Sequence, residues 1–231
     1  MEREGPLTID RNQKAADATF YNPSESKFTR HYREEVEMVF SGLDCALAHE
    51  QAVYCSTELT TGARLYAALR EHKLKSKDEL RKQMGKDWYN ANLWEPNIRA
   101  AIEFAKSVRS ALGGRTMVVT PAPFTAPGWS QPEYLAFWET LLRTRIKSAW
   151  FNRNWQFSNG CTFEFAVAQH AGLSTLDHEG NTLDLLAGIE LVKDAINKLN
   201  SEGFETSKLR EYLHRLSAVR AQTERNFADK V

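Results

Sequence analysis

Four short apolar segments, separated by stretches with helical periodicity, constrain the fold of this chain most strongly. They are rich in β-branched and aromatic residues, as strands are, and they are AVYCS (52–56), TMVVTPA (116–122), SAWFN (148–152) and LSTLDH (173–178). Strands that alternate with helices predict an α/β fold, with a parallel sheet flanked by helices. We therefore expect a Rossmann-like sheet with extra N- and C-terminal helices.

The helices themselves are predicted from apolar residues that recur every three or four positions. Such stripes occur over 32–48, 94–112, 134–142, 185–199 and 209–219. The charged stretch 70–87 is interpreted as a solvated excursion, either a surface helix or a loop.

The chain has 231 residues and no visible internal repeat. Its first 30 residues are polar and lack periodicity, so we interpret 1–30 as an N-terminal arm. Residues 31–231 are interpreted as a single α/β domain, which ends in a helical extension over about 183–228.

Composition excludes several classes of function. Lys plus Arg and Asp plus Glu both number 30, so the formal net charge is zero and nothing favours a nucleic-acid polymer or an anionic membrane. No apolar run approaches the ~18 residues of a membrane span, and the N-terminus lacks a signal-peptide core. The three cysteines form no metal or disulfide pattern, so we expect a cytoplasmic protein without a metal site.

Ligands of parallel α/β sheets bind beyond the carboxyl ends of the strands. Here these ends lead into the loops 56–62, 121–130, 152–160 and 178–182. Candidate ligand-binding residues are therefore sought in these four loops.

The first loop carries small hydroxyl residues, a glycine and an arginine: Ser56, Thr57, Gly62 and Arg64. Hydroxyl groups and exposed backbone N–H groups can hold a ligand, and an arginine can fork onto an anion. The alternative is an ordinary turn with a surface arginine.

The next two loops are rich in aromatic residues. Phe124 and Trp129 lie among prolines and could form a stacking wall for a planar base, whereas Asn152 and Trp155 could contact a base or sugar. The alternative is that these aromatic residues pack against the body of the protein.

Glu164 follows the third loop and has two interpretations. With Asn159 as the helix cap it lies in the second turn, and with Cys161 as the cap it occupies the capping-box position, although cysteine is a poor cap. In the functional interpretation its carboxylate attacks the anomeric carbon of a sugar. Cys161 is a competing nucleophile, because a helix N-terminus lowers the pKa of a thiol.

Two motifs resemble those of the nucleoside 2-deoxyribosyltransferase superfamily. SNGCTFEFAVA (158–168) is similar to its signature helix, in which a Gly turn precedes the nucleophilic Glu, and AVYCSTELTTGARLY (52–66) is similar to its first strand and ligand loop. The resemblance covers about residues 50–180, with 70–92 as a large insertion.

The resemblance implies that Glu164 is the nucleophile and that Tyr54 orients it. It also implies that Ser158, Gly160 and Arg64 hold a phosphate, because the base-exchanging transferases carry Asp at the position of Ser158 and an aspartate would repel that phosphate.

Asn159, between Ser158 and Gly160, is expected to contact the substrate as well. The favoured branch is the nucleoside 5′-monophosphate N-glycosidases, hydrolases of nucleotide metabolism that need no cofactor. Two alternatives stay open: a nucleoside 2-deoxyribosyltransferase that exchanges bases, and a nucleotide-binding or sensing module without turnover. The resemblance also implies a homodimer or higher homo-oligomer, in which the helices over 32–48 and 207–226 could form an interface or pack within their own subunit.

Overall fold

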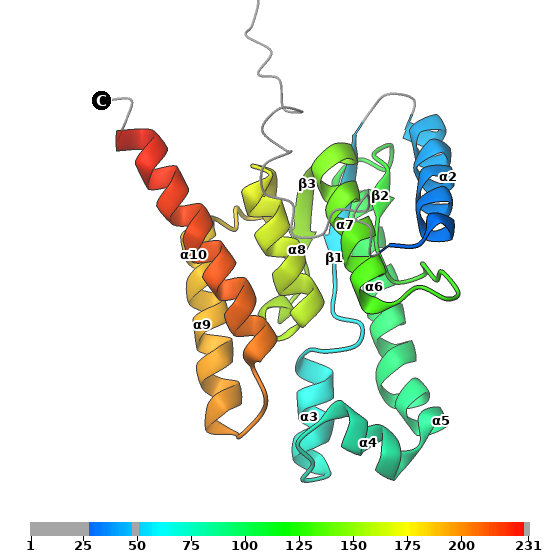
Figure 1. Ribbon diagram of the computed structural model, residues 1–231, viewed down its shortest axis with the longest axis vertical. Helices are drawn as coiled ribbons and strands as arrows, with labels where there is room; N and C mark the ends of the chain where they lie inside the picture. The colour runs from blue at the N-terminus through cyan, green and yellow to red at the C-terminus, as the bar shows by residue number, and fades with distance from the viewer. Residues whose placement is uncertain (1–27, 48–50, 229–231) are drawn as a thin grey trace, which may run out of the picture.

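A four-stranded sheet forms the centre of the protein in a computed structural model, which describes residues 28–47 and 51–228 (Figure 1). All of its strands are parallel, in the order β2-β1-β3-β4. Their bounds are β1 (Ala52–Ser56), β2 (Val118–Val119), β3 (Ile146–Phe151) and β4 (Ser174–Leu176). The predicted α/β class, a Rossmann-like parallel sheet flanked by helices, is confirmed.

Helices surround this sheet and fill the segments between its strands. In chain order they are α2 (Arg30–Leu47), α3 (Ala63–Glu71), α4 (Lys77–Met84), α5 (Lys86–Tyr89), the π-helical turn η2 (Asn90–Trp94), α6 (Glu95–Ala111), α7 (Gln131–Arg145), the 3₁₀ turn η3 (Trp155–Phe157), α8 (Asn159–His170), α9 (Leu185–Ser201) and α10 (Ser207–Ala228).

Alternating residues of β1 face opposite sides of the sheet, as the two-residue period of a strand requires. Val53 and Cys55 pack against α6 in a small core cluster on one face. Ala52 and Tyr54 belong to the main core on the other face, which also contains buried residues of α7 and α8. Both faces of β1 are therefore covered, which is why AVYCS is apolar throughout.

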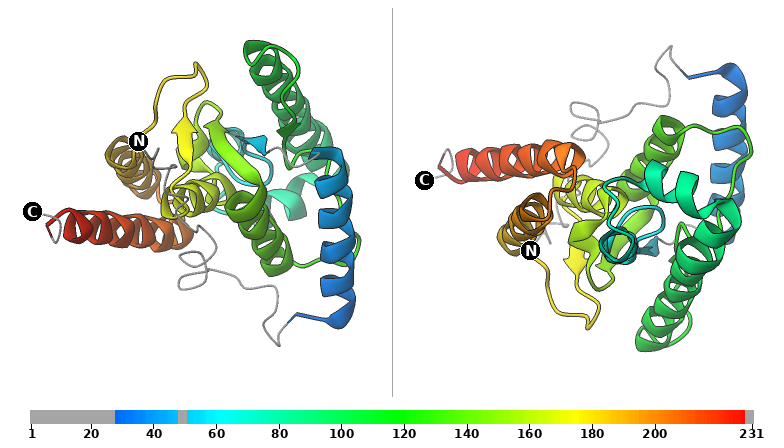
Figure 2. Two further views of the ribbon diagram at one scale, coloured as in Figure 1. Left: turned by 90° about the horizontal axis from the view of Figure 1, so that it is seen from above. Right: turned by 90° about the horizontal axis from the view of Figure 1, so that it is seen from below.

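The terminal helices pack against this frame at opposite sides of the molecule (Figure 2). On α2, the ring of Phe40 stacks on Phe137 of α7, with 5.1 Å between ring centroids. On α9, Gly188 lies so close to α8 that an added Cβ would meet the ring of Phe165 at 2.2 Å. The helices outside the sheet thus pack within their own subunit.

Three segments differ from the sequence predictions. The strand predicted over 116–122 shrinks to two residues, since Pro121 ends the run and proline has no N–H to donate to the sheet. The strand predicted over 173–178 is shortened to Ser174–Leu176. The charged stretch 70–87 forms the short helices α4 and the start of α5, and of the predicted arm all but residues 28–30 lie outside the described ranges.

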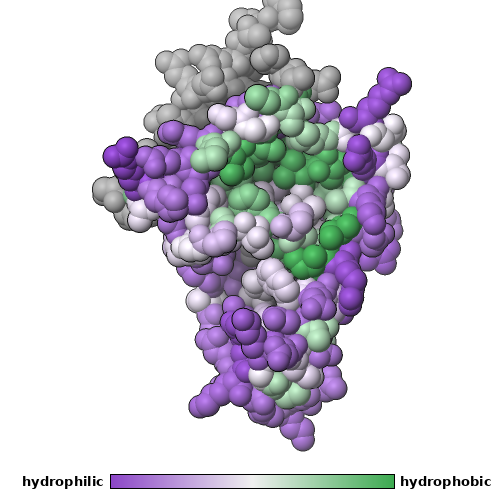
Figure 3. Space-filling model, turned by 90° about the vertical axis from the view of Figure 1, so that its right-hand side faces the viewer, coloured by the Kyte–Doolittle hydropathy of each residue, from purple (hydrophilic) through white to green (hydrophobic). Residues whose placement is uncertain are grey.

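The surface on the α2 side divides into two parts (Figure 3). Apolar residues gather on its upper half, whereas its lower end, in the region of α3 to α5, is hydrophilic. The charged segment 70–87 therefore lies in a region that faces solvent, as the sequence indicated.

Candidate functional site

The direction in which successive strands are added to the sheet reverses between β1 and β3. From β1 the chain crosses to β2 on one side, and it later returns to add β3 and β4 on the other. At this position the backbone N–H of Asn152 donates to the carbonyl oxygen of Ser56 at 3.1 Å, which joins the ends of the two strands. Ligand sites of open α/β sheets lie at such switch points.

Helix α8 starts directly after β3 and brings Glu164 to this position. Its cap is Ser158, whose Oγ accepts a hydrogen bond from the N–H of Cys161 at 3.4 Å. The prediction of a cap at Asn159 or Cys161 is therefore wrong, and so is the capping-box interpretation of Glu164. Ser158 is a favourable cap residue, and Glu164 lies in the second turn of α8, where it satisfies no N–H group of the helix end.

The carboxyl group of Glu164 is buried next to hydroxyl groups from β1. Its side chain is only 6% exposed, and the hydroxyl of Ser56 donates to Oε2 at 2.5 Å. The hydroxyl of Tyr54 lies beside the same carboxyl group and favours the ionised form of Glu164. This hydroxyl is buried and makes no well-formed hydrogen bond in the described part of the chain.

These surroundings act on the pKa of Glu164 in opposite directions. Burial raises this pKa from its ordinary 4.5 to about 7, while the hydroxyl groups of Ser56 and Tyr54 lower it. At neutral pH the carboxylate and the carboxylic acid are thus both populated, and a pKa shifted in this way by burial is typical of groups at functional sites.

Cys161 does not have the properties expected of a competing nucleophile. Its side chain is 1% exposed, and burial, together with the charge of Glu164, raises the pKa of its thiol far above the ordinary value. The sequence-based expectation of a lowered pKa is wrong, because the loss of hydration outweighs the helix N-terminus. At neutral pH this thiol stays protonated.

Glu164 lines a cavity of about 640 Å³, a size that suits a small-molecule ligand. Three of the four predicted loops meet there, and they contribute the predicted residues Thr57, Phe124, Ser158, Asn159 and Gly160. The loop 178–182 does not contribute to this cavity.

Thr57 is of special interest among the lining residues. Its side chain is only 5% exposed, yet its hydroxyl has no hydrogen-bond partner in the part of the chain that the structure describes. A buried hydroxyl without a partner costs free energy, and a ligand with a polar group could supply that partner.

Two predicted residues of the first loop have other roles. The guanidinium of Arg64 donates from Nε to Oδ1 of Asn97 at 2.9 Å, and Arg64 does not line the cavity. Gly62 has φ 141° and lies against Glu58, whose Oε2 would be 2.0 Å from an added Cβ. That same carboxylate accepts the N–H of Ala63 at 2.6 Å, so Glu58 occupies the N-terminus of α3, where a ligand phosphate could otherwise bind.

Three further predicted residues also lie outside the cavity lining. The indole N–H of Trp129 donates to Glu35 of α2 at 2.7 Å. Trp155 is 4% exposed and packs against Phe151 and Phe165, so it belongs to the core. The side chain of Asn152 accepts the N–H of the next residue in the chain. The structure therefore does not support a base wall formed by the two tryptophans.

Other aromatic side chains form the wall instead. Trp94, Tyr134, Trp138 and Tyr212 line the cavity and come from the segments η2, α7 and α10. Trp94, Tyr134 and Trp138 lie in the apolar stripes from which helices were predicted, and no local signal distinguishes a side chain that packs on the sheet from one that extends past its edge. The lining also includes Lys77 and Lys208, which the sequence did not single out.

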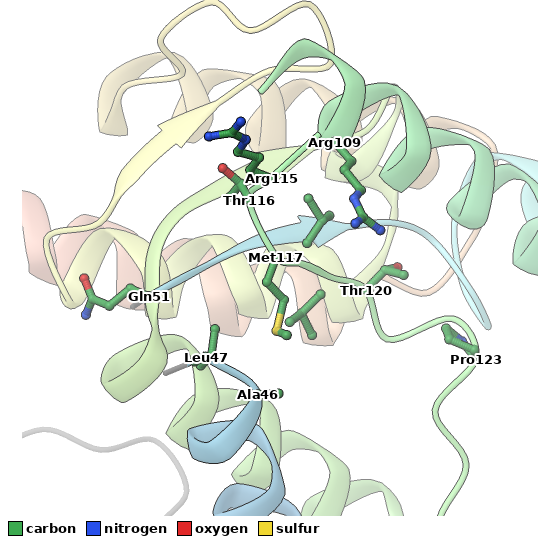
Figure 4. A pocket seen from close by; sticks show the side chains of 11 residues that line it. Ala46, Leu47, Gln51, Arg109, Arg115, Thr116, Met117, Thr120 and Pro123 are labelled. Atoms are coloured by element: carbon green, nitrogen blue, oxygen red, sulfur yellow. The ribbon is translucent and has the colours of Figure 1, made fainter. Parts of the chain in front are cut away.

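A second cavity of about 560 Å³ lies at the outer edge of the sheet, between the end of α2, β2 and α6 (Figure 4). Its lining shares no residue with the Glu164 cavity. Arg109 and Arg115 lie on it, but none of its described lining residues is a carboxylate, histidine or cysteine. The cavity at the switch point, which holds the buried carboxyl group of Glu164, is therefore the candidate active site.

Within residues 28–47 and 51–228, no group of three or more His, Cys, Asp or Glu side chains could hold a metal ion. None of the helices in these ranges is long and apolar enough to cross a membrane. No family model, curated protein or solved structure matches this chain.

Proposed function

We propose that this protein cleaves the N-glycosidic bond of a (deoxy)nucleoside 5′-monophosphate, with Glu164 as the nucleophile. The observation that carries the proposal is the setting of this carboxyl group. It is buried at the switch point of the sheet, it accepts a hydrogen bond from Ser56, and it lines a cavity large enough for a small ligand. A carboxylate beside a substrate cavity is the usual nucleophile of retaining glycoside-cleaving enzymes.

The proposed reaction has two steps. First, a carboxylate oxygen of Glu164 forms a bond to the anomeric carbon while the carbon–nitrogen bond breaks; its electron pair goes to the base, which takes a proton from solvent. Water then attacks the same carbon, the ester bond breaks, the carboxylate is regenerated, and a proton returns to solvent. The net change is the consumption of one water and the release of a base and a sugar phosphate.

The residues around Glu164 fit these steps chemically. Because Ser56 and Tyr54 favour the ionised carboxyl, they maintain the nucleophile in a site whose burial opposes ionisation. Trp94, Trp138 and Phe124 present aromatic surface that suits a planar base. The hydroxyl of Thr57 could accept or donate a hydrogen bond to the sugar.

The decisive experiment measures the products of wild-type protein incubated with dCMP or deoxycytidine, with and without a free acceptor base. Hydrolysis predicts cytosine and deoxyribose 5-phosphate from dCMP without an acceptor. In the same assay, Glu164→Gln should reduce the rate by at least 10³-fold, because an amide is a poor nucleophile. Glu103→Gln is the matched control, since Glu103 lies on the surface in an ion pair with Lys106.

Intermediate trapping adds a direct test. Rapid acid quench and mass spectrometry should find the sugar phosphate attached to the peptide that contains Glu164. Base exchange that strictly requires an acceptor would replace the hydrolase proposal by a transferase. Tight binding of nucleotides with no product under either condition would refute both and leave a binding module.

A further inference from the structure

The two lysines of the candidate active-site cavity come from segments that are far apart in the sequence. Lys77 is the first residue of α4, in the segment between β1 and β2, and Lys208 lies in the first turn of α10, after the last strand. In Figure 1 α4 lies beyond the end of the sheet, whereas α10 packs along α8, with 5.6 Å between the ring centroids of Tyr212 and Phe163. Both nevertheless line the same cavity.

Charge is distributed unevenly in this cavity. Its described lining has two cationic side chains, Lys77 and Lys208, and one acidic side chain, Glu164; the other lining residues are neutral. A ligand that satisfies all three groups has an anionic part and, separately, an electrophilic carbon. A phosphomonoester of a nucleoside has both.

The lysines differ in how strongly they are engaged within the protein. Lys77 is half-buried and has no ion-pair partner in the described part of the chain. Lys208 pairs with Glu211 at 2.9 Å, but its side chain is 54% exposed, and ion pairs with this exposure contribute little. The ammonium group of Lys77 can therefore turn to a bound anion without breaking an ion pair, whereas Lys208 would exchange contacts within the protein, its pair with Glu211 among them, for contacts with the anion.

The other cationic residue that was considered for phosphate binding, the arginine of the first loop, already has a partner within the protein. Arg64 donates to Asn97, and the N-terminus of α3 carries the carboxylate of Glu58. A phosphate placed there would meet the half-buried carboxyl group of Glu58. Within the cavity lining, the start of α8 at Ser158 and Gly160 and the two lysines remain as groups that can donate to an anion.

We propose that Lys77 and Lys208 together bind the phosphate group of the substrate and determine the preference for nucleotides over nucleosides. This inference rests on the proposed function for its choice of substrate. It assigns the specificity to two helices outside the sheet, separate from the β1 and α8 residues that hold the nucleophile.

The test compares kcat/KM for dCMP and deoxycytidine in Lys77→Ala, Lys208→Ala and the double variant. Each single change should reduce kcat/KM for dCMP by about 10- to 100-fold, as expected for the loss of one charge-assisted hydrogen bond. The value for deoxycytidine should change by less than threefold. Lys82→Ala is the matched control, because Lys82 is an exposed lysine on the same helix as Lys77 and lies outside the cavity lining.

Failure of this inference can be distinguished from failure of the proposed function. Equal losses on dCMP and deoxycytidine, or no loss on either, would overturn the role of the lysines while cleavage by Glu164 stands. If wild-type protein cleaves neither compound, calorimetric titration with dCMP still tests whether the lysines bind the phosphate. Weaker binding of dCMP by the lysine variants, with unchanged binding by Lys82→Ala, supports the phosphate site. Unchanged binding by the double variant refutes it.

Discussion

Replacing Glu164 by glutamine should stabilise the protein at alkaline pH and leave its stability unchanged at acid pH. Glutamine has nearly the same shape, and its amide oxygen can still accept the hydrogen bond from Ser56. The difference between the two residues is the charge, which only glutamate can carry. The stability difference between variant and wild type therefore reports the cost of holding that charge in the cavity.

The size of this cost follows from the pKa of Glu164. Burial raises it from 4.5 to about 7, and one pKa unit is equivalent to about 1.4 kcal/mol, so the cost is about 3 kcal/mol. The native state holds the proton to a higher pH than the unfolded chain does. Wild-type stability therefore falls as pH rises between 4.5 and 7, and the full cost applies above pH 7.

Urea unfolding followed by circular dichroism at pH 4, 6 and 8.5 measures the effect. Glu164→Gln should match wild type at pH 4 and exceed it by about 3 kcal/mol at pH 8.5, equivalent to roughly 6–12 °C in Tm for a chain of this size. Glu103→Gln should show no such pH dependence. A difference that is constant with pH, or that favours wild type at pH 8.5, would refute the burial of an ionisable carboxyl at this position.

Three further predictions concern the walls of the cavity and the first loop. Gly62→Ala should destabilise the protein by about 1–3 kcal/mol in thermal unfolding, because φ 141° and the contact with Glu58 leave no room for a methyl group; a neutral result would contradict that contact. Thr57→Val preserves the shape of the side chain and should leave the free energy of unfolding equal or higher, while it lowers kcat/KM for dCMP by about tenfold. A loss of stability would show that the hydroxyl of Thr57 has a partner in the protein. Trp138→Ala and Trp155→Ala should both lower the free energy of unfolding by about 3–5 kcal/mol, because both side chains are buried in the main core. Only Trp138→Ala should also raise KM, since only Trp138 lines the cavity, and the reverse result would place Trp155 at the ligand.

Much of the architecture was predictable because periodicity reflects burial. The strand AVYCS is apolar on both faces since α6 covers Val53 and Cys55 while α7 and α8 cover Ala52 and Tyr54. The rule that ligands bind at the carboxyl ends of strands then identified three of the loops that meet around Glu164. These features depend on local pattern and on a general property of parallel sheets.

The identity of the cavity wall depends on tertiary packing and was not predictable in the same way. Trp138 and Trp155 are both buried tryptophans of the main core, but the first also lines the cavity and the second does not. Which face of α7 extends past the sheet is decided by how the helix packs, and a sequence stripe does not contain that information. Similarly, Lys77 lies in a charged run whose residues look alike until the fold brings one of them to the cavity.

In the loop after β1, a single side chain decides whether the loop can bind an anion. A glycine, several hydroxyl residues and an arginine suggested an anion site, with an ordinary turn as the alternative. The intervening glutamate decides the outcome, because Glu58 folds back onto the N-terminus of α3 and excludes a second anion.

The contact between Glu58 and Gly62 has a consequence for how this loop can change over evolutionary time. Glycine is favoured at position 62 both by its φ of 141° and by the carboxylate of Glu58 that lies against it, and that carboxylate in turn satisfies the N–H of Ala63. Substitutions at the two positions should therefore be non-additive, with a side chain at position 62 tolerated better once Glu58 is shortened. A descendant that acquires a phosphate-binding loop here must first lose its own carboxylate and pass through a form with an uncapped helix. On the proposed assignment of the phosphate to Lys77 and Lys208, anion recognition can instead change by single substitutions that leave this loop intact.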